Sequence, residues 1–180
     1  MHERRFHRDK DTLRSPERIA RLEVDRVVKL SLQNIKPQNV LDIGTGTGLF
    51  AERFARQGLR IAGVDANPEM IKAVQDYLPH GEFLKGIAEV LPFPDQSFDL
   101  VFMGVLLHET DDAQQALREA RRVARIRLSI LEWPYRQEES GPPLEHRLKP
   151  KTVESQAAEA GFRNFEMITL THTVLYRMSV

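Results

Sequence analysis

The chain has 180 residues, and its 26 basic and 26 acidic side chains give a formal net charge of zero. This balance gives no electrostatic indication of a nucleic-acid partner, and the absence of cysteine excludes disulfides and thiolate metal sites. No apolar run approaches the roughly 20 residues of a membrane-spanning helix, and no apolar signal region begins the chain, so we expect a cytoplasmic protein without a membrane span.

The first predicted element is an amphipathic helix over residues 16–32. Ser15 is a suitable N-cap and Pro16 suits the first helical position, while apolar residues recur on a helical period from Ile19 to Leu30. We expect residues 1–36 to form an N-terminal segment with a lid or packing helix. Residues 37–180 then form the rest of a single domain, since a chain of 180 residues can bury a sizeable core.

Strand and helix patterns alternate from residue 37 onwards, which favours a mainly parallel sheet with helices on both faces. Only a short turn around Thr171 and His172 separates the last two strands, so this pair is expected to be antiparallel. The prediction is a doubly wound α/β fold with seven strands and an antiparallel C-terminal strand. Strands are expected near 39–43, 60–64, 82–85, 98–103, 126–132, 163–169 and 173–179, and helices near 48–57, 68–77, 111–124 and 151–160.

The step from the helix near 111–124 into the strand near 126–132 contains no glycine or proline. Connections in α/β units usually have about 2–6 residues. Either the helix ends early near Arg122, or the turn is unusually tight at Ala124 and Arg125.

A glycine-rich turn follows the first predicted strand in VLDIGTGTGLF, residues 40–50. Glycine allows backbone conformations that other residues avoid, and it lets a ligand approach the main chain closely. A dinucleotide fingerprint would need glycine where this chain has Leu49, so pyrophosphate binding is disfavoured. Asp65 ends the second strand about 20 residues after Gly44, where a carboxylate can accept both hydrogen bonds of a ribose diol. The spacing predicts a ribose-containing ligand without a diphosphate.

Three segments in this order, residues 40–48, the Asp65 region and residues 86–103 (GIAEVLPFPDQSFDLVFM), resemble the class I S-adenosylmethionine-dependent methyltransferases. The resemblance is strongest to small proteins similar to the ubiquinone and menaquinone C-methyltransferases, the methyltransferase type 11-like subgroup. It implies a Rossmann-like fold, S-adenosyl-L-methionine as the cofactor, and a cofactor-binding methyltransferase domain over residues 37–180.

The resemblance also implies which residues hold the methyl donor near the glycine turn. Gly44 and Gly46 are expected beneath its methionine and ribose portions, with Thr45 or Thr47 supplying backbone or hydroxyl contacts. Asp42 ends the first strand, where it orients the turn or meets the donor's amino group through water.

A second group of donor contacts is expected beyond the next two strands. Asp65 is the expected ribose ligand, Ala66 lies beside the adenine and Met70 covers it, whereas Asn67 is favoured as a helix cap. Related enzymes often have Asp-Ala-Glu at the position of Ile87-Ala88-Glu89. Without that aspartate, Ala88 would act through its backbone, and Glu89 is a candidate contact.

Residues Gly104 to Glu109 follow the fourth strand and are expected to face the cleft at the carboxyl edge of the sheet. Within this segment, Gly104 permits close approach of a ligand. The intrinsic pKa of histidine suits a general base, so His108 is the candidate catalytic residue. A histidine that caps the next helix or shapes the pocket is an equal alternative. Asp111 and Asp112 fit the first turn of that helix, and no metal site is predicted there.

The acceptor pocket is expected after the fifth strand, at Glu132, Trp133 and Tyr135. The two aromatic rings could line this pocket or contact a cation through their faces, or they could belong to ordinary packing. Loop 136–150 carries His146 and is either a lid that recognises a polar acceptor or a solvated connection.

Three functional hypotheses follow. The leading one is transfer of a methyl group from S-adenosylmethionine to an unidentified small molecule, with homo-oligomerisation left open. A non-catalytic regulatory protein that binds the same donor is the alternative, because the aspartate is missing at Ile87 and the turn near Ala124 is compressed. A nicotinamide-dependent oxidoreductase is disfavoured by Leu49.

Overall fold

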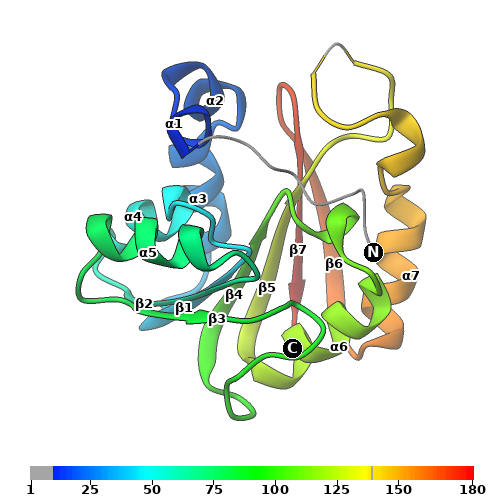
Figure 1. Ribbon diagram of the computed structural model, residues 1–180. Coiled ribbons are helices and arrows are strands. Elements are labelled where there is room, and N and C mark those ends of the chain that lie inside the picture. Colours follow the sequence, from blue (N-terminus) through cyan, green and yellow to red (C-terminus); the bar gives the residue numbers. More distant parts are fainter. Residues whose placement is uncertain (1–9, 139) are drawn as a thin grey trace.

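A seven-stranded sheet forms the centre of the computed structural model, which describes residues 10–138 and 140–180 (Figure 1). Strands β1 to β5 pair in parallel, whereas β7 is antiparallel to both β5 and β6, in the order β3-β2-β1-β4-β5-β7-β6. The predicted fold class and C-terminal hairpin are confirmed. The strands are β1 (Asn39–Ile43), β2 (Arg60–Asp65), β3 (Glu82–Lys85), β4 (Phe98–Gly104), β5 (Ala124–Glu132), β6 (Arg163–Thr169) and β7 (Val174–Ser179).

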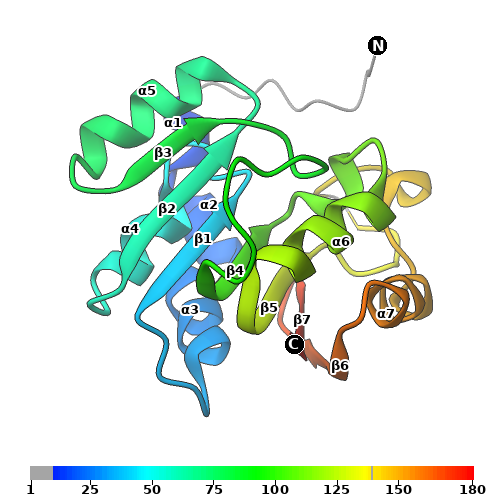
Figure 2. The same ribbon diagram turned by 90° about the horizontal axis from the view of Figure 1, so that it is seen from below.

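Helices cover both faces of this sheet (Figures 1 and 2). Helices α3, α4 and α5 lie on one face, and α6 and α7 lie on the other. The helices are α1 (Lys10–Leu13), α2 (Pro16–Arg21), α3 (Val24–Leu32), α4 (Leu49–Ala55), α5 (Pro68–Tyr77), α6 (Ala113–Val123) and α7 (Pro150–Glu159), with 3-10 turns η1 (Leu107–Glu109) and η2 (Leu144–His146). None of the helices in the described ranges is long and apolar enough to cross a membrane.

The alternation of side chains along β4 explains why residues 100–103 of this central strand are all apolar. Leu100 and Phe102 pack with the aromatic rings of α4 on one face, where the Phe50 and Phe102 ring centroids are 4.8 Å apart. Val101 and Met103 belong to the core on the opposite face, under α6 and α7. A strand that is buried on both sides reads as a continuous hydrophobic run, and its C-terminal end is therefore held rigidly.

The helix predicted over residues 16–32 is divided into two, which corrects the sequence prediction. Helix α2 ends at Arg21 and α3 begins at Val24, with Glu23 in the left-handed conformation at φ 47°. Ser15 caps α2 as predicted. Leu22 and Val24 are both buried, and the Glu23 carboxylate accepts a hydrogen bond from the backbone N–H of Thr171 at 2.7 Å. These tertiary contacts offset a left-handed residue, which costs about 1–2 kcal/mol.

Helix α6 passes into β5 without any connecting residue. The helix ends at Val123, one residue past Arg122, and Ala124 and Arg125 belong to the strand, so neither the early end nor the turn at Ala124 and Arg125 describes the step fully. The pairing with β4 changes register between Phe98 and Leu100, which face Ala124 and Arg127. This bulge on β5 accommodates the abrupt start of the strand.

Candidate functional site

A cavity of about 700 Å³ lies at the carboxyl ends of β1, β2 and β4. Its floor includes Gly44 after β1, Asp65 at the end of β2 and Gly104 at the end of β4. Because β2 and β4 flank β1 and lead away in opposite directions, the cavity occupies the topological switch point of the sheet. Open α/β sheets bind their ligands at this position, and the volume is ordinary for a small-molecule site.

The glycine turn provides a bare backbone surface to this cavity. Gly44 has φ 71°, and its N–H donates to the carbonyl oxygen of Val64 at 2.8 Å. A Cβ atom at Gly44 would lie 2.7 Å from Leu106, so a side chain does not fit there. A Cβ atom at Gly46, where φ is 52°, would have only Leu13 nearby, at 3.9 Å. The turn therefore presents open space to a ligand at Gly46.

Asp65 lines the cavity and also fixes the shape of the glycine turn. Its Oδ2 accepts a hydrogen bond from the backbone N–H of Gly46, and its Oδ1 accepts one from that of Asn67, both at 2.8 Å. Burial raises the pKa of Asp65 although these two N–H groups favour the charged form. A carboxylate has about four acceptor positions. Two of them are available for a ligand in the cavity.

Asp42 and Thr45, which the sequence places among the donor contacts, lie behind the turn and do not line the cavity. Asp42 is only 2% exposed, and it accepts a hydrogen bond from Thr45 Oγ1 at 2.9 Å. Burial raises the pKa of Asp42 to about 7. Of the two roles predicted for Asp42, the geometry favours orientation of the turn.

The other predicted donor residues lie on the cavity wall. They are Ala66, Met70, Ala88, Glu89 and Gly104. Glu89 also accepts hydrogen bonds from the backbone N–H groups of Asp111 and Asp112, at 2.8 and 3.3 Å, and so holds the first turn of α6. Asn67 caps α5 as predicted, through the N–H of Glu69. The wall therefore carries the predicted residues, and their contacts with a donor stay predictions.

His108 is buried beside Glu132 and does not line the cavity. Its Nδ1 lies 2.8 and 3.0 Å from the two Glu132 carboxylate oxygens, and its backbone N–H donates to Glu132 at 3.1 Å. Burial lowers the pKa of His108, but the charge and hydrogen bond of Glu132 and the charge of Glu109 outweigh this effect and raise it. His108, the predicted base, therefore does not itself reach the cavity.

The residues expected to form an acceptor pocket, Glu132, Trp133, Tyr135 and His146, are not brought to this cavity. Glu132 points to His108, and Trp133 is buried in the core. Tyr135 is 40% exposed beside Lys149, and His146 lies on η2. The loop after β5 is held in shape by Arg147, which donates hydrogen bonds to the carbonyl oxygens of Pro134, Arg136, Ser140 and Pro142.

Two cavity residues, Leu13 and Arg18, reach the cavity from the N-terminal helices and were not predicted from the sequence. Leu106 and Glu109 also line it, and they belong to the segment Gly104 to Glu109 that was expected to face this edge of the sheet, although neither was singled out. Burial raises the pKa of Glu109 to about 7. Glu109 directly follows His108 and lies past the end of β4, and this position could have singled it out as a residue that faces the cavity. Nothing in the local sequence marks Leu13 or Arg18, because their role depends on how the helices fold back.

Residues 41–127 match the sequence profile of a family described as a methyltransferase domain. The demethylmenaquinone methyltransferase of Thermotoga maritima is 40% identical over 111 residues, which cover 59% of this chain and 48% of that protein. The demethylmenaquinone methyltransferase of Chlorobaculum tepidum is 34% identical over 104 residues, which cover 57% of this chain and 43% of that protein. The chain thus spans about half the length of these relatives.

The fold is also found in a known crystal structure, that of a SAM-dependent methyltransferase from Aquifex aeolicus. The two structures superpose with a TM-score of 0.83 and 23% sequence identity. The match covers 97% of this chain and 100% of the other, so the similarity includes both the N-terminal helices and the C-terminal hairpin.

Proposed function

Because this chain belongs, through residues 41–127, to the class I S-adenosylmethionine-dependent methyltransferase family, we propose that it transfers a methyl group from S-adenosylmethionine to a small-molecule acceptor. The observation that carries this proposal is the position of Asp65. Its carboxylate lies at the cavity wall, hydrogen-bonded to Gly46 of the glycine turn. A ribose diol bound there would lie directly beside exposed backbone.

The residues of the cavity fit such a donor. S-adenosylmethionine supplies an electrophilic methyl group on a positively charged sulfur. Among the residues that the structure describes, the cavity wall carries five carboxylate side chains and one guanidinium, that of Arg18. An excess of carboxylates complements a cationic ligand. The carboxylates belong to Asp65, Glu69, Glu89, Glu109 and Asp111.

The chain's main contribution to methyl transfer is positioning. Gly44 and Gly46 let a ligand lie against the backbone, Asp65 orients the ribose, and Met70 covers the adenine. Leu13 and Arg18 line the cavity from the N-terminal helices. Holding two reactants at attack distance can contribute about 7–11 kcal/mol to lowering the barrier.

Finer expectations belong to the same proposal. The acceptor is a small molecule and the location is cytoplasmic, while homo-oligomerisation stays open. The division into a lid segment, residues 1–36, and a donor-binding domain, residues 37–180, is likewise proposed. It is supported by Leu13 and Arg18, which reach the cavity from the first segment; residues 1–9 lie outside the described residues.

Calorimetric titration of the full chain with S-adenosylhomocysteine and with NAD tests the donor class. We expect S-adenosylhomocysteine to bind more tightly, and tighter binding of NAD would contradict the proposal. A screen of small acceptors with isotopically labelled S-adenosylmethionine then tests transfer. A protein that binds the donor and labels no acceptor in a broad screen would favour the regulatory alternative.

A further inference from the structure

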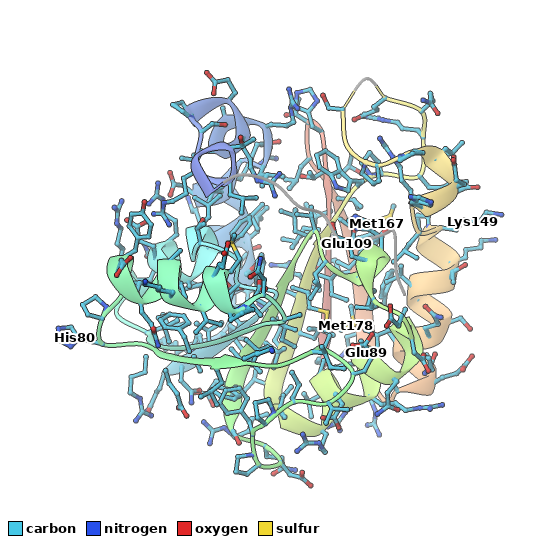
Figure 3. All side chains as sticks on the ribbon, in the orientation of Figure 1. His80, Glu89, Glu109, Lys149, Met167 and Met178 are labelled. Atoms are coloured by element: carbon cyan, nitrogen blue, oxygen red, sulfur yellow. The ribbon has the colours of Figure 1, made fainter. Side chains whose placement is uncertain are left out.

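Three side chains connect the buried interior to the ligand cavity. Glu132, at the end of β5, contacts the Nδ1 atom of His108 at 2.8 Å. The Nε2 atom on the other side of the same imidazole lies 3.6 Å from Oε1 of Glu109. Glu109 lines the cavity on η1, directly after β4 (Figure 3). The imidazole therefore lies between two carboxylates, of which one faces the cavity.

The inner end of this row is fixed by hydrogen bonds. Glu132 is only 1% exposed, and its carboxylate accepts hydrogen bonds from the backbone N–H groups of His108 and Trp133, both at 3.1 Å. A carboxylate can only accept, so Nδ1 of His108 is the donor to it. This arrangement fixes the ring and directs Nε2 toward Glu109.

Glu109 forms the outer end of the row, and of the three groups it alone lines the cavity. The side chain of Glu109 is 23% exposed, against 6% for His108 and 2% for Glu132. A proton leaving a ligand in the cavity would have to pass Glu109 before it could reach His108. This order distinguishes Glu109 from the base predicted from the sequence.

The charges that face Glu109 come from four elements. Burial is the largest influence and raises its pKa, to which the negative charges of Glu132 on β5 and Asp65 on β2 add. The positive charges of His108 on the same turn and of Arg18 on α2 act in the opposite direction. The pKa of about 7 that results is suitable for a group that must accept a proton near neutral pH and release it again.

We propose that Glu109 is the catalytic base that removes a proton from the O–H or N–H group of the methyl acceptor, and that His108 and Glu132 are positioning residues that hold it. This inference rests on the proposed methyltransferase function. The acceptor's proton moves to a carboxylate oxygen of Glu109. The freed electron pair on oxygen or nitrogen forms the new bond to the methyl carbon, while the bond from that carbon to sulfur breaks and leaves its electrons on sulfur.

The first test compares Glu109→Gln with Glu154→Gln, a control on the exposed side of α7. Transfer is measured with labelled S-adenosylmethionine on phenols and on amines, which separates the two sources of the proton. We expect Glu109→Gln to lose about 100-fold or more of its transfer rate, with unchanged affinity for S-adenosylhomocysteine in calorimetry. The control keeps the wild-type rate, and an equal rate in Glu109→Gln would overturn the proposal.

The second test is independent of turnover. The carboxyl carbons of glutamate are labelled with carbon-13, and the Glu109 signal is identified by its loss in Glu109→Gln. We expect this group to titrate near pH 7 in the wild type, and at higher pH in His108→Asn because a facing positive charge has been removed. The acidic limb of the rate profile should move with it. A purely structural His108 would alter stability and leave both curves in place.

The two tests separate the possible failures. If the wild type labels no acceptor, the proposed function fails, while the carbon-13 titration still decides whether Glu109 has the properties of a base. A Glu109 signal that titrates in the ordinary acidic range overturns the present inference even in an active enzyme. If His108→Ala abolishes the acidic limb while the Glu109 signal keeps its wild-type titration, the base is His108 instead.

Discussion

The guanidinium of Arg14 donates a hydrogen bond to the carbonyl oxygen of Thr47 at 2.7 Å, which ties the N-terminal helices to the glycine turn. The same side chain pairs with Glu52 of α4 and lies 3.9 Å from the ring centre of Tyr77 on α5. Its neighbours Leu13 and Arg18 line the cavity. Arg14 therefore attaches the cavity-lining part of the N-terminal segment to the glycine turn and to α4.

Replacing Arg14 by alanine should weaken binding of S-adenosylhomocysteine about fivefold to thirtyfold, because loss of a partly buried charged hydrogen bond costs on the order of 1–2 kcal/mol. Calorimetry measures the affinity. Arg56→Ala is the matched control, since Arg56 pairs with the same Glu52 but is exposed and lies at the C-terminal end of α4. Equal affinities of the two variants would contradict a role of residues 13–18 in donor binding.

Asp65→Ala should lower the affinity for S-adenosylhomocysteine at least tenfold, because a charged acceptor for ribose hydroxyls is worth about 1.5–3 kcal/mol. The variant also releases the N–H groups of Gly46 and Asn67, so its melting temperature should fall. Asp76→Ala, on the exposed part of α5, serves as the control. A folded Asp65→Ala protein with unchanged donor affinity would contradict the assignment of Asp65 as the ribose ligand.

Gly44→Ala should be more damaging than Gly58→Ala, although both glycines have positive φ. The left-handed conformation alone costs a non-glycine residue about 1–2 kcal/mol. At Gly58 the added methyl group meets nothing within 4 Å, whereas at Gly44 it would lie 2.7 Å from Leu106. Chemical denaturation measures the difference in stability, and we expect donor binding to be impaired only in Gly44→Ala.

The pKa of Asp42 makes a prediction for the pH dependence of stability. Burial raises this pKa from 3.8 to about 7, so the folded state holds a proton over a pH range where the unfolded state has lost it. The contribution of Asp42 to stability therefore decreases as the pH rises from about 4 to about 7. Above that range the carboxylate is charged in both states, and its burial disfavours folding.

Asp42→Asn removes this titration. We expect the unfolding free energy of the variant, relative to the wild type, to increase between about pH 4 and pH 7 by up to about 4 kcal/mol. Urea denaturation at several pH values measures it, with Asp76→Asn as an exposed control. A difference that does not vary with pH would show that Asp42 does not titrate in this range.

Much of the fold could be predicted because each pattern has a local cause. The buried run of β4 and the glycine turn after β1 are visible in the sequence itself. The positions of Gly44, Asp65 and Gly104 followed from the rule that ligands bind at the carboxyl ends of parallel strands. Ala66, Met70, Ala88 and Glu89 were predicted from the resemblance to a known family.

The errors arose where a distant contact determines the local structure. The break at Glu23 contains no glycine or proline, and its carboxylate is held by Thr171 from the opposite end of the chain. Successive side chains of a strand point to opposite faces of the sheet. Leu131 therefore packs toward α3 and α4, whereas the next residue, Glu132, points toward His108. A residue at a strand end can therefore face the interior as readily as the ligand.

Because α6 passes directly into β5, residues 113–132 form one uninterrupted unit of secondary structure. A glutamate carboxylate lies at each end of it. Glu89 holds its beginning through the N–H groups of Asp111 and Asp112, and Glu132 stands at its end beside His108. An inserted or deleted residue within this unit would change the distance between the two, whereas the loop at 133–149 can absorb a change in length. Length differences among homologues should therefore accumulate in that loop and be rare between residues 113 and 132.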